Sequence, residues 1–316
     1  MKLKKLNAQE LQELTTLLTS SLSSRAVSRR LGSRVSKSTV NNLRKALQSQ
    51  TEPRSGPRIL LLDIETTPEI SFNWGRWKQY ISQEQVIEHP YILTFAVRWL
   101  DTGETISRKL TDYPTLFSRD LRDDSGLVRD LWQLLEQADI VVAHNGDKFD
   151  IPWVQARAIK YGLPPLNSKK FVDTLKVAKK LIRIPSNSLD SITKYYGLRP
   201  KLGNAGFPLW RSCMQGNTQA FLDMETYNRG DLDALEDVYL LFRPYMRNHP
   251  SVQLYYPDDI ARCTRCGSHD LHEQQEMYHT GISSFGTVRC NSCGAVHRTR
   301  KNQRTTDQMS NTLVGV

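Results

Sequence analysis

A short apolar run that ends in two acids places the strongest constraint on the fold of this chain. The stretch ILLLDIETTP, from Ile59 to Pro68, predicts a strand over 59–64 of the kind buried in the middle of a sheet. Because side chains alternate along a strand, Asp63 and Glu65 project from one face, with their Cα atoms roughly 6 to 7 Å apart. Two such carboxylates repel each other by about 4 kcal/mol at contact distance and an effective dielectric of 20. A divalent cation removes this repulsion, because Mg²⁺ and Mn²⁺ prefer oxygen ligands, so the stretch predicts a metal site.

Two further segments bring acids to the ends of predicted elements. ADIVVAHNGDKFDIPWV predicts a strand over Ile140–Ala143, followed by Asp150 at the start of a helix. METYNRGDLDALEDVYLLF has helical periodicity, and Tyr227 and Asp231, at positions i and i+4, share one face of that helix. Together the three segments form the pattern Asp-x-Glu, Asn-x-x-x-Phe-Asp and Tyr-x-x-x-Asp.

This set of motifs resembles the DEDD 3′-to-5′ exonucleases, in the subclass whose third motif carries Tyr, and most closely the proofreading domain of family B DNA polymerases. The segments FNWGRWKQYI, HNGDKFD and YNRGDLDALEDVYLLFRPYMRNHP, together with the terminal cysteines, are also similar to stand-alone exonucleases of tailed bacteriophages. The resemblance covers about Arg58 to Pro250. It implies an α/β fold, in which a ribonuclease-H-like core of a mixed sheet flanked by helices occupies residues 58–250.

The same resemblance implies roles for individual residues. Two Mg²⁺ or Mn²⁺ ions would be held by four carboxylates, those of Asp63, Glu65, Asp150 and Asp231. Asp63 would bridge both ions, and the Tyr227 hydroxyl would orient the attacking water. Three further motif residues are candidate contacts to nucleic acid: Thr67, Asn145 and Phe149. Three other acids lie close by in sequence but do not fall on the family's spacing: Asp147, Asp233 and Asp237.

Positive charge is concentrated at the two ends of the chain. The net charge is +10, and residues 1–50 hold ten Lys and Arg against two Asp and Glu. Residues 262–304 hold seven against three, which leaves the centre near neutral. Basic ends around a near-neutral centre predict that the ends attract a polyanion such as nucleic acid.

The N-terminal 50 residues predict a helix-turn-helix, joined to the core by a linker over 51–57. SSRAVSRRLGSRVSKSTVNNLRKAL contains two short helical patterns separated at Gly32, and Ser36 would cap the second. The turn is longer by about two residues than in resolvases and transposases, which this segment resembles. A plain three-helix cap or a protein-contact module is the alternative. The predicted core is Ala26, Leu31, Val35, Val40 and Leu43, and the predicted DNA-facing residues are Lys37, Ser38, Asn41 and Arg44.

Two Cys-x-x-Cys-Gly sequences near the C-terminus predict a zinc ribbon over residues 258–302. The four ligands would be Cys263, Cys266, Cys290 and Cys293, which leave no open position, so one Zn²⁺ would be structural. Zinc binding would supply on the order of 10 kcal/mol to a segment too short for its own core. Three histidines are alternative ligands: His269, His272 and His279. The remaining Cys213 is expected in the core, and residues 303–316 are expected to be disordered. The basic ribbon would contact nucleic acid or, alternatively, protein.

These predictions combine into a metal-dependent 3′-to-5′ exonuclease that releases nucleoside 5′-monophosphates from DNA, either single-stranded or at the 3′ ends of a duplex. A DNA polymerase or replisome component would be its protein partner. One alternative is an RNA-directed exonuclease of the same fold, and another is a catalytically inactive DNA-binding accessory protein of a replication complex. No stretch is apolar for long enough to span a bilayer and the N-terminus lacks a signal-peptide apolar segment, so a cytoplasmic protein is expected, in the host cytoplasm if phage-encoded.

Overall fold

The computed structural model describes residues 13–14, 16–18, 22–31, 35–37, 39–41, 56–203 and 205–315. The chain divides into two compact units. The first consists of Met1–Ser55 and Tyr255–Asp258, and the second of Gly56–Leu254 and Asp259–Val316.

The described part of the first unit contains helix α2 (Ser24–Arg30). Ser23 caps this helix by accepting the backbone N–H of Ala26 at 3.2 Å. Val27 is buried and Ala26 only half-buried, because residues 27 and 31 share one helical face. The predicted core is therefore shifted by one residue at this position. The buried side chains are Leu14, Leu17, Val27, Leu31, Val35 and Val40.

The second predicted helix of this unit is described only in part. Ser36 accepts the backbone N–H of Thr39 at 3.1 Å, which is the cap that the sequence predicted. Lys37 and Asn41 are exposed. Gly32, Ser38, Leu43 and Arg44 lie outside the described residues, and the helix-turn-helix itself stays a prediction.

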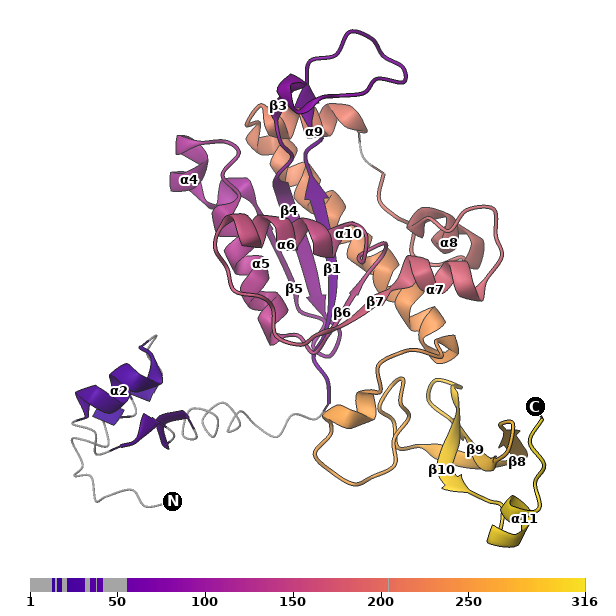
Figure 1. Cartoon of the computed structure of the whole chain (residues 1–316). Coiled ribbons are helices and arrows are strands. Elements are labelled where there is room, and N and C mark those ends of the chain that lie inside the picture. The colour runs from indigo at the N-terminus through magenta and orange to yellow at the C-terminus, as the bar shows by residue number, and fades with distance from the viewer. Residues whose placement is uncertain are drawn as a thin grey trace. The chain divides into compact units, whose positions relative to one another are not determined.

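A five-stranded mixed sheet forms the centre of the second unit, with strand order β5-β4-β1-β6-β7 (Figure 1). Strand β1 (Ile59–Thr66) pairs antiparallel with β4 (Ile92–Trp99) and parallel with β6 (Ile140–Ala143). Strand β5 (Thr105–Lys109) pairs antiparallel with β4, and β7 (Lys170–Asp173) pairs parallel with β6. The predicted mixed sheet is confirmed, with β1 at its centre.

Helices cover both faces of this sheet. In Figure 1, α5 (Ser125–Gln137) and α6 (Asp150–Lys160) lie in front of the sheet, and α10 (Thr218–Phe242) lies behind it. The other α-helices described between Gly56 and Leu254 are α4 (Pro114–Arg119), α7 (Thr174–Leu181), α8 (Leu189–Tyr196) and α9 (Phe207–Met214). The 3₁₀ turns are Gln83–Gln85, Leu110–Asp112, Arg243–Tyr245 and Val252–Tyr255, and a two-stranded sheet pairs β2 (Ile70–Ser71) with β3 (Val86–Glu88).

The main core lies between the sheet and its helices. Alternate residues of β1, Leu60, Leu62 and Ile64, pack there with Leu127 and Leu131 of α5. Cys213 is buried in the same cluster, as the sequence predicted. Because side chains alternate along β1, Asp63 and Glu65 project from the opposite face.

The three strands β8 (Leu271–His279), β9 (Ser284–Cys290) and β10 (Val296–Asn302) form an antiparallel sheet of order β10-β9-β8. The chain after β10 differs from the disordered tail expected over 303–316, because Thr306–Ser310 form helix α11. The helix begins with a capping box in which Thr305 accepts the N–H of Gln308 at 3.2 Å and the Gln308 side chain accepts the N–H of Thr305 at 2.9 Å. Among the described residues, no helix combines the length and the apolarity that crossing a membrane requires.

Candidate active site

Strand β1 carries the first two acids to the site. Asp63 lies opposite Ala96 of β4 and Glu65 lies opposite Thr94, and the register shifts directly after Glu65. Asp63, Glu65 and Asp231 each offer a carboxylate oxygen, and these three oxygens all lie within 4.8 Å of one another. The structure therefore brings together three of the four predicted metal ligands.

Helix α10 supplies Asp231 together with Tyr227, one turn earlier. The Tyr227 ring packs edge-on against Trp210 of α9, with ring centroids 6.2 Å apart. The Lys201 ammonium lies 2.8 Å from Asp231 Oδ2 and 4.8 Å from the centroid of the Tyr227 ring. The segment that carries Lys201 packs closely against α10 at Gly230, because a Cβ at that position would overlap the side chain of the next residue, Leu202. Lys201 is therefore part of the site, although no pattern in the sequence indicated it.

Asp150 begins α6, as predicted, and lies beside the three converging acids. Its Oδ1 accepts the backbone N–H of Ile64 at 3.2 Å, which ties the start of α6 to β1 between the two strand acids. Burial raises the pKa of Asp150 to about 7, although hydrogen bonds from two backbone N–H groups oppose the rise. Asp150 also raises the pKa of Asp63, so its charge acts on the site.

The other carboxyl groups also hold their protons more tightly than usual. Burial raises the pKa of Glu65 from its ordinary value of 4.5 to about 8, and Asp231 adds to this rise. Burial, followed by the charges of Asp150 and Glu65, raises the pKa of Asp63 well above its usual range. Burial also raises the pKa of Asp231, and Lys201 opposes that rise. One ammonium group thus compensates only part of the negative charge gathered here.

Asn228, which the sequence analysis missed, orients Asp63. Its Nδ2 donates to Asp63 Oδ2 at 2.5 Å, and its Oδ1 accepts the Thr94 hydroxyl at 3.2 Å. The three side chains come from α10, β1 and β4. Asn228 precedes Asp231 by three residues within YNRGD, and residues at i and i+3 are neighbours on a helix surface. This spacing was the signal in the sequence that could have placed Asn228 beside the acids.

The site has the features that a divalent cation requires. Asp231 Oδ1 is buried and has no hydrogen-bond partner among the described residues, whereas its Oδ2 is paired with Lys201. A buried carboxylate oxygen without a partner is costly, and a cation ligated by it would remove that cost. Oxygen ligands at short mutual distances suit Mg²⁺ or Mn²⁺. The residues present therefore fit such an ion.

A cleft of about 880 Å³ opens over these acids. Its lining includes Asp63, Tyr227 and Asp231 together with parts of α7, α8 and the segment 201–203, and three of its lining residues are basic: Lys179, Lys194 and Lys201. His144 joins its walls, since Nδ1 lies 2.9 Å from the Thr174 hydroxyl and Nε2 lies 3.1 Å from the carbonyl oxygen of Asn187. Burial lowers the pKa of His144, which favours a neutral ring in this position.

The other nearby acids are engaged in ion pairs away from this cluster. Asp147 pairs with Lys176 at 2.5 Å, Asp233 with Arg98 at 2.7 Å and Asp237 with Arg199 at 2.7 Å. The spacing of the motifs left these three acids out of the predicted metal ligands, and their ion pairs agree with that prediction.

The candidate contacts to nucleic acid differ in their exposure. Thr67 is buried, and its hydroxyl accepts the N–H of Tyr91 at 3.0 Å, so this side chain secures the end of β1 and does not fit the predicted contact. Asn145 is half-buried with a left-handed φ of 70°, and its N–H donates to Asp173 at 3.0 Å. Phe149 is half-buried against the core, beside Trp153. Asn145 and Phe149 keep part of their surface exposed.

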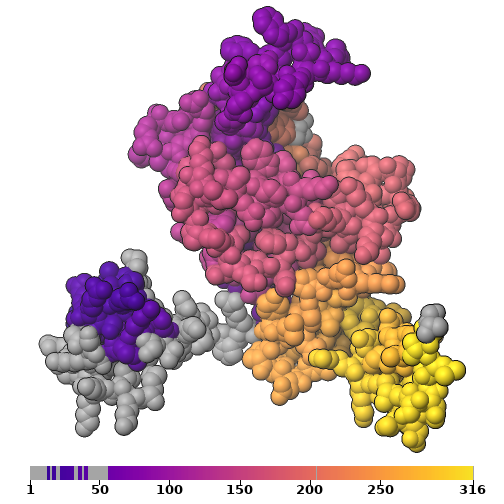
Figure 2. Space-filling view, in the orientation of Figure 1, coloured from indigo at the N-terminus to yellow at the C-terminus, as the bar shows by residue number. Residues whose placement is uncertain are grey.

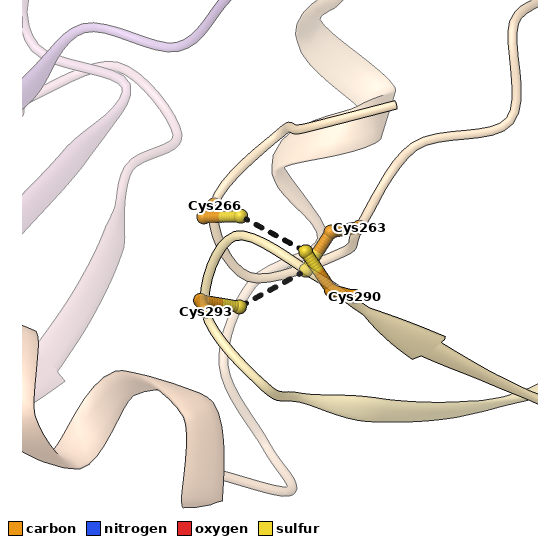
Figure 3. Close-up of side chains that lie close together, drawn as sticks. All are labelled: Cys263, Cys266, Cys290 and Cys293. Atoms are coloured by element: carbon orange, nitrogen blue, oxygen red, sulfur yellow. Dashed lines mark hydrogen bonds between the residues drawn. The ribbon is translucent and has the colours of Figure 1, made fainter. Parts of the chain in front are cut away.

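The four predicted zinc ligands converge at the base of the β8–β10 sheet (Figure 3). The Sγ atoms of Cys263 and Cys293 are 3.6 Å apart, as are those of Cys266 and Cys290. A tetrahedral Zn²⁺ with Zn–S bonds of about 2.3 Å separates its sulfurs by about 3.8 Å, so this group fits zinc. The left-handed glycines Gly267 and Gly294 form the two tight turns.

A fifth side chain, His297, contacts this cysteine group. Its Nε2 lies 3.2 Å from Cys263 Sγ and its Nδ1 lies 3.3 Å from the Thr264 hydroxyl. Burial raises the pKa of the Cys263 thiol, but hydrogen bonds from His297 and from backbone N–H groups outweigh it and lower that pKa to about 5. The predicted alternative ligands are not in the cluster: His272 contacts Asn291 and His279 contacts Ser284.

Comparison with known proteins places the chain in a family. Residues 84–242, half of the chain, match the RNase_H superfamily, and the chain belongs to this superfamily. The matched range includes Asp150, Tyr227 and Asp231, and it begins after the acids of β1.

Two DNA polymerases are similar to parts of the chain. A stretch of 57 residues, 18% of this chain, is 40% identical to 4% of a DNA polymerase III PolC-type from Ureaplasma parvum serovar 3. The solved structure of the family B DNA polymerase from the hyperthermophilic archaeon Pyrobaculum calidifontis aligns at 17% identity and a TM-score of 0.42, over 59% of this chain and 25% of its own. The chain thus spans a small part of each polymerase.

Proposed function

We propose that this protein is a metal-dependent 3′-to-5′ exonuclease that hydrolyses DNA to nucleoside 5′-monophosphates. One observation carries the proposal: within a member of the RNase_H superfamily, oxygens of Asp63, Glu65 and Asp231 converge within 4.8 Å of one another, and Asp63, Asp231 and Tyr227 line a cleft. The similarity of one stretch to a DNA polymerase favours DNA as the substrate and a polymerase or replisome component as the partner.

Four acids would hold two Mg²⁺ or Mn²⁺ ions: Asp63, Glu65, Asp150 and Asp231. When bound, these ions would lower the pKa of the attacking water and stabilise the negative charge of the leaving oxygen. Asn228 would keep the Asp63 carboxylate in one orientation through its 2.5 Å hydrogen bond. Buried carboxyl groups that resist ionisation alone would then ionise on binding the cations.

Tyr227 would orient the attacking water. Burial raises the pKa of its hydroxyl to about 12, so the group stays protonated at neutral pH and can donate or accept a hydrogen bond. Its ring is held between Trp210 and the Lys201 ammonium, which limits the positions of the hydroxyl. A fixed hydroxyl beside the acids suits a water held for in-line attack on phosphorus.

The remaining modules would capture substrate without joining the chemistry. Lys179, which lines the cleft, would neutralise a phosphate of the entering strand. The other two cleft lysines are engaged in ion pairs, Lys194 with Asp190 and Lys201 with Asp231. The four cysteines would hold one structural Zn²⁺, since four thiolates leave no position for a substrate. The basic N-terminal segment would act as a helix-turn-helix on DNA.

The test is degradation of single- and double-stranded DNA and RNA carrying either a 5′ or a 3′ label, with Mg²⁺, Mn²⁺ or EDTA. A 5′-labelled DNA strand should shorten one nucleotide at a time with either metal and persist in EDTA. An Asp63→Asn variant is the matched control for a contaminating nuclease, because it removes one charge and keeps the shape. Preferential loss of RNA would change the substrate assignment, and inert wild-type protein that still binds DNA would favour an accessory role.

A further inference from the structure

The segment that connects β2 to β3 exposes four aromatic side chains within nine residues. The exposed fractions are 73% for Phe72, 99% for Trp74, 84% for Trp77 and 90% for Tyr80. Figure 1 draws this segment as the long purple loop above β3, and Figure 2 shows it projecting from the surface of the core. Large aromatic side chains are normally buried, so a group of them held in solvent marks a surface that contacts another molecule.

The base of this loop is held in place by hydrogen bonds. The N–H of Phe72 donates to the carbonyl oxygen of Gln85, and the Gln85 side-chain amide returns a bond to the carbonyl oxygen of Phe72, each at 2.9 Å. Within the loop, Gln79 Nε2 donates to the carbonyl oxygen of Trp77 at 2.8 Å. The aromatic rings therefore extend from an anchored hairpin that follows the β1 acids directly in sequence.

The chemistry of the loop matches a single-stranded nucleic acid. Residues 70–83 contain Arg76 and Lys78, both exposed, and no Asp or Glu. Rings stack on bases whatever their sequence, and cations between the rings contact the phosphates. An apolar groove on a protein would use the rings and leave the two cations without a function, whereas a nucleic acid strand uses both.

We propose that residues 72–80, here called the aromatic loop, bind the single strand of nucleic acid whose 3′ end lies in the candidate active site. The part of the proposal that places the 3′ end of the strand in the candidate active site rests on the proposed exonuclease function. Phe72 follows Glu65 by seven residues, which span at most about 25 Å. That upper limit equals about seven base steps of 3.4 Å, so a strand of twenty nucleotides is long enough to reach from the site to the loop.

The first test is binding without catalysis. In EDTA, fluorescence anisotropy would measure the affinity for labelled dT₂₀ and U₂₀, which separates DNA from RNA as the strand. The Trp74→Ala/Trp77→Ala variant should bind about 30-fold more weakly, because two stacking platforms are removed. The matched Trp74→Phe/Trp77→Phe variant keeps two rings and should stay within about threefold of wild type. Replacing Arg76 and Lys78 by Gln should make the plot of log binding constant against log salt concentration less steep. Its slope should fall in magnitude by about 0.7 for each phosphate that is no longer neutralised.

The second test separates this inference from the proposed function. Hydrolysis of a dinucleotide should be equal in wild type and in the Ala variant, whereas kcat/KM on dT₂₀ should fall in the Ala variant. Wild-type affinity and wild-type kcat/KM on dT₂₀ in the Ala variant would overturn the inference and assign the rings to a protein partner. Strong loop-dependent binding by a wild-type protein that hydrolyses neither substrate would instead leave the loop assignment standing and refute the exonuclease.

Discussion

The Nδ2 of Asn228 lies 2.5 Å from Oδ2 of Asp63, and this contact joins helix α10 to strand β1 at the centre of the candidate site. Because Thr94 of β4 donates to the same amide, the Asp63 carboxylate is held by two successive hydrogen bonds. The orientation of a metal-ligating carboxylate depends on such partners.

Removing this amide should therefore impair metal binding as well as activity. We expect Asn228→Ala to lower Mg²⁺ affinity or kcat/KM by about 10- to 100-fold, as loss of a supporting hydrogen bond does at metal sites. Isothermal titration with Mg²⁺ or Mn²⁺ and exonuclease assays measure the two effects. Gln219→Ala, an exposed amide on the same helix, is the control and should change neither. Unaltered metal affinity in Asn228→Ala would show that Asp63 needs no such support.

Loss of the Tyr227 hydroxyl should affect the rate without affecting metal. Tyr227→Phe keeps the ring between Trp210 and Lys201, so the fold and the acids should be preserved. If the hydroxyl positions the water, kcat should fall by about 10- to 1000-fold while Mn²⁺ binding persists. Asp63→Ala should instead lose both. Equal loss of metal in the two variants would mean that Tyr227 organises the acids and does not act on the water.

The metal-free protein should become less stable as the pH rises from about 4.5 to 8. The folded state raises the pKa of Glu65 from 4.5 to about 8, so the folded protein binds more protons than the unfolded chain in this interval. Stability from this group is fully present below pH 4.5 and is lost as the pH passes through about 8. Thermal melts in EDTA should show Tm falling by roughly 5 to 15 °C across this range.

Two comparisons check the origin of this pH dependence. Glu65→Gln should flatten part of the slope, whereas Glu84→Gln, an exposed carboxyl, should leave it unchanged. Saturating Mg²⁺ should stabilise wild type most at high pH, where the acids are ionised. A wild-type slope retained in Glu65→Gln would assign the effect to other groups.

Loss of one cysteine should release zinc and unfold the ribbon alone. We expect metal analysis to find zinc in wild type and to find it lost from Cys263→Ser and Cys290→Ser. Each variant keeps only three of the four thiolates that a structural zinc site requires. Proteolysis should then cut within residues 258–302 while the 58–250 core resists. Cys213→Ser is the control, since that thiol is buried in the core away from the cluster. A full equivalent of zinc in both ligand variants would refute the assignment.

Local pattern predicted the elements that carry the site. The apolar run before Asp63 forms β1 because only a central strand buries such residues on both faces, and the i, i+4 spacing of Tyr227 and Asp231 sets them on one face of α10. The cysteine turns were equally predictable, since Gly267 and Gly294 adopt the left-handed backbone.

Other features depended on contacts between distant segments. Thr67 follows the first motif and was expected at the nucleic acid, but its hydroxyl is used by Tyr91 on the neighbouring strand segment. Lys201 lies in a segment without periodicity, and it pairs with Asp231 where Gly230 leaves room for the adjacent Leu202. The capping box at Thr305 was visible in the sequence and was overlooked.

The sequence by itself determined which residues could become ligands, because strand alternation, helical spacing and paired Cys-x-x-Cys turns are local properties of the chain. Tertiary structure decided which of the acids converge, which are neutralised by Arg and Lys, and how strongly burial resists their ionisation. Those outcomes depend on distances and desolvation set by side chains up to 168 positions apart, as for Asp63 and Asp231, and no local pattern encodes them.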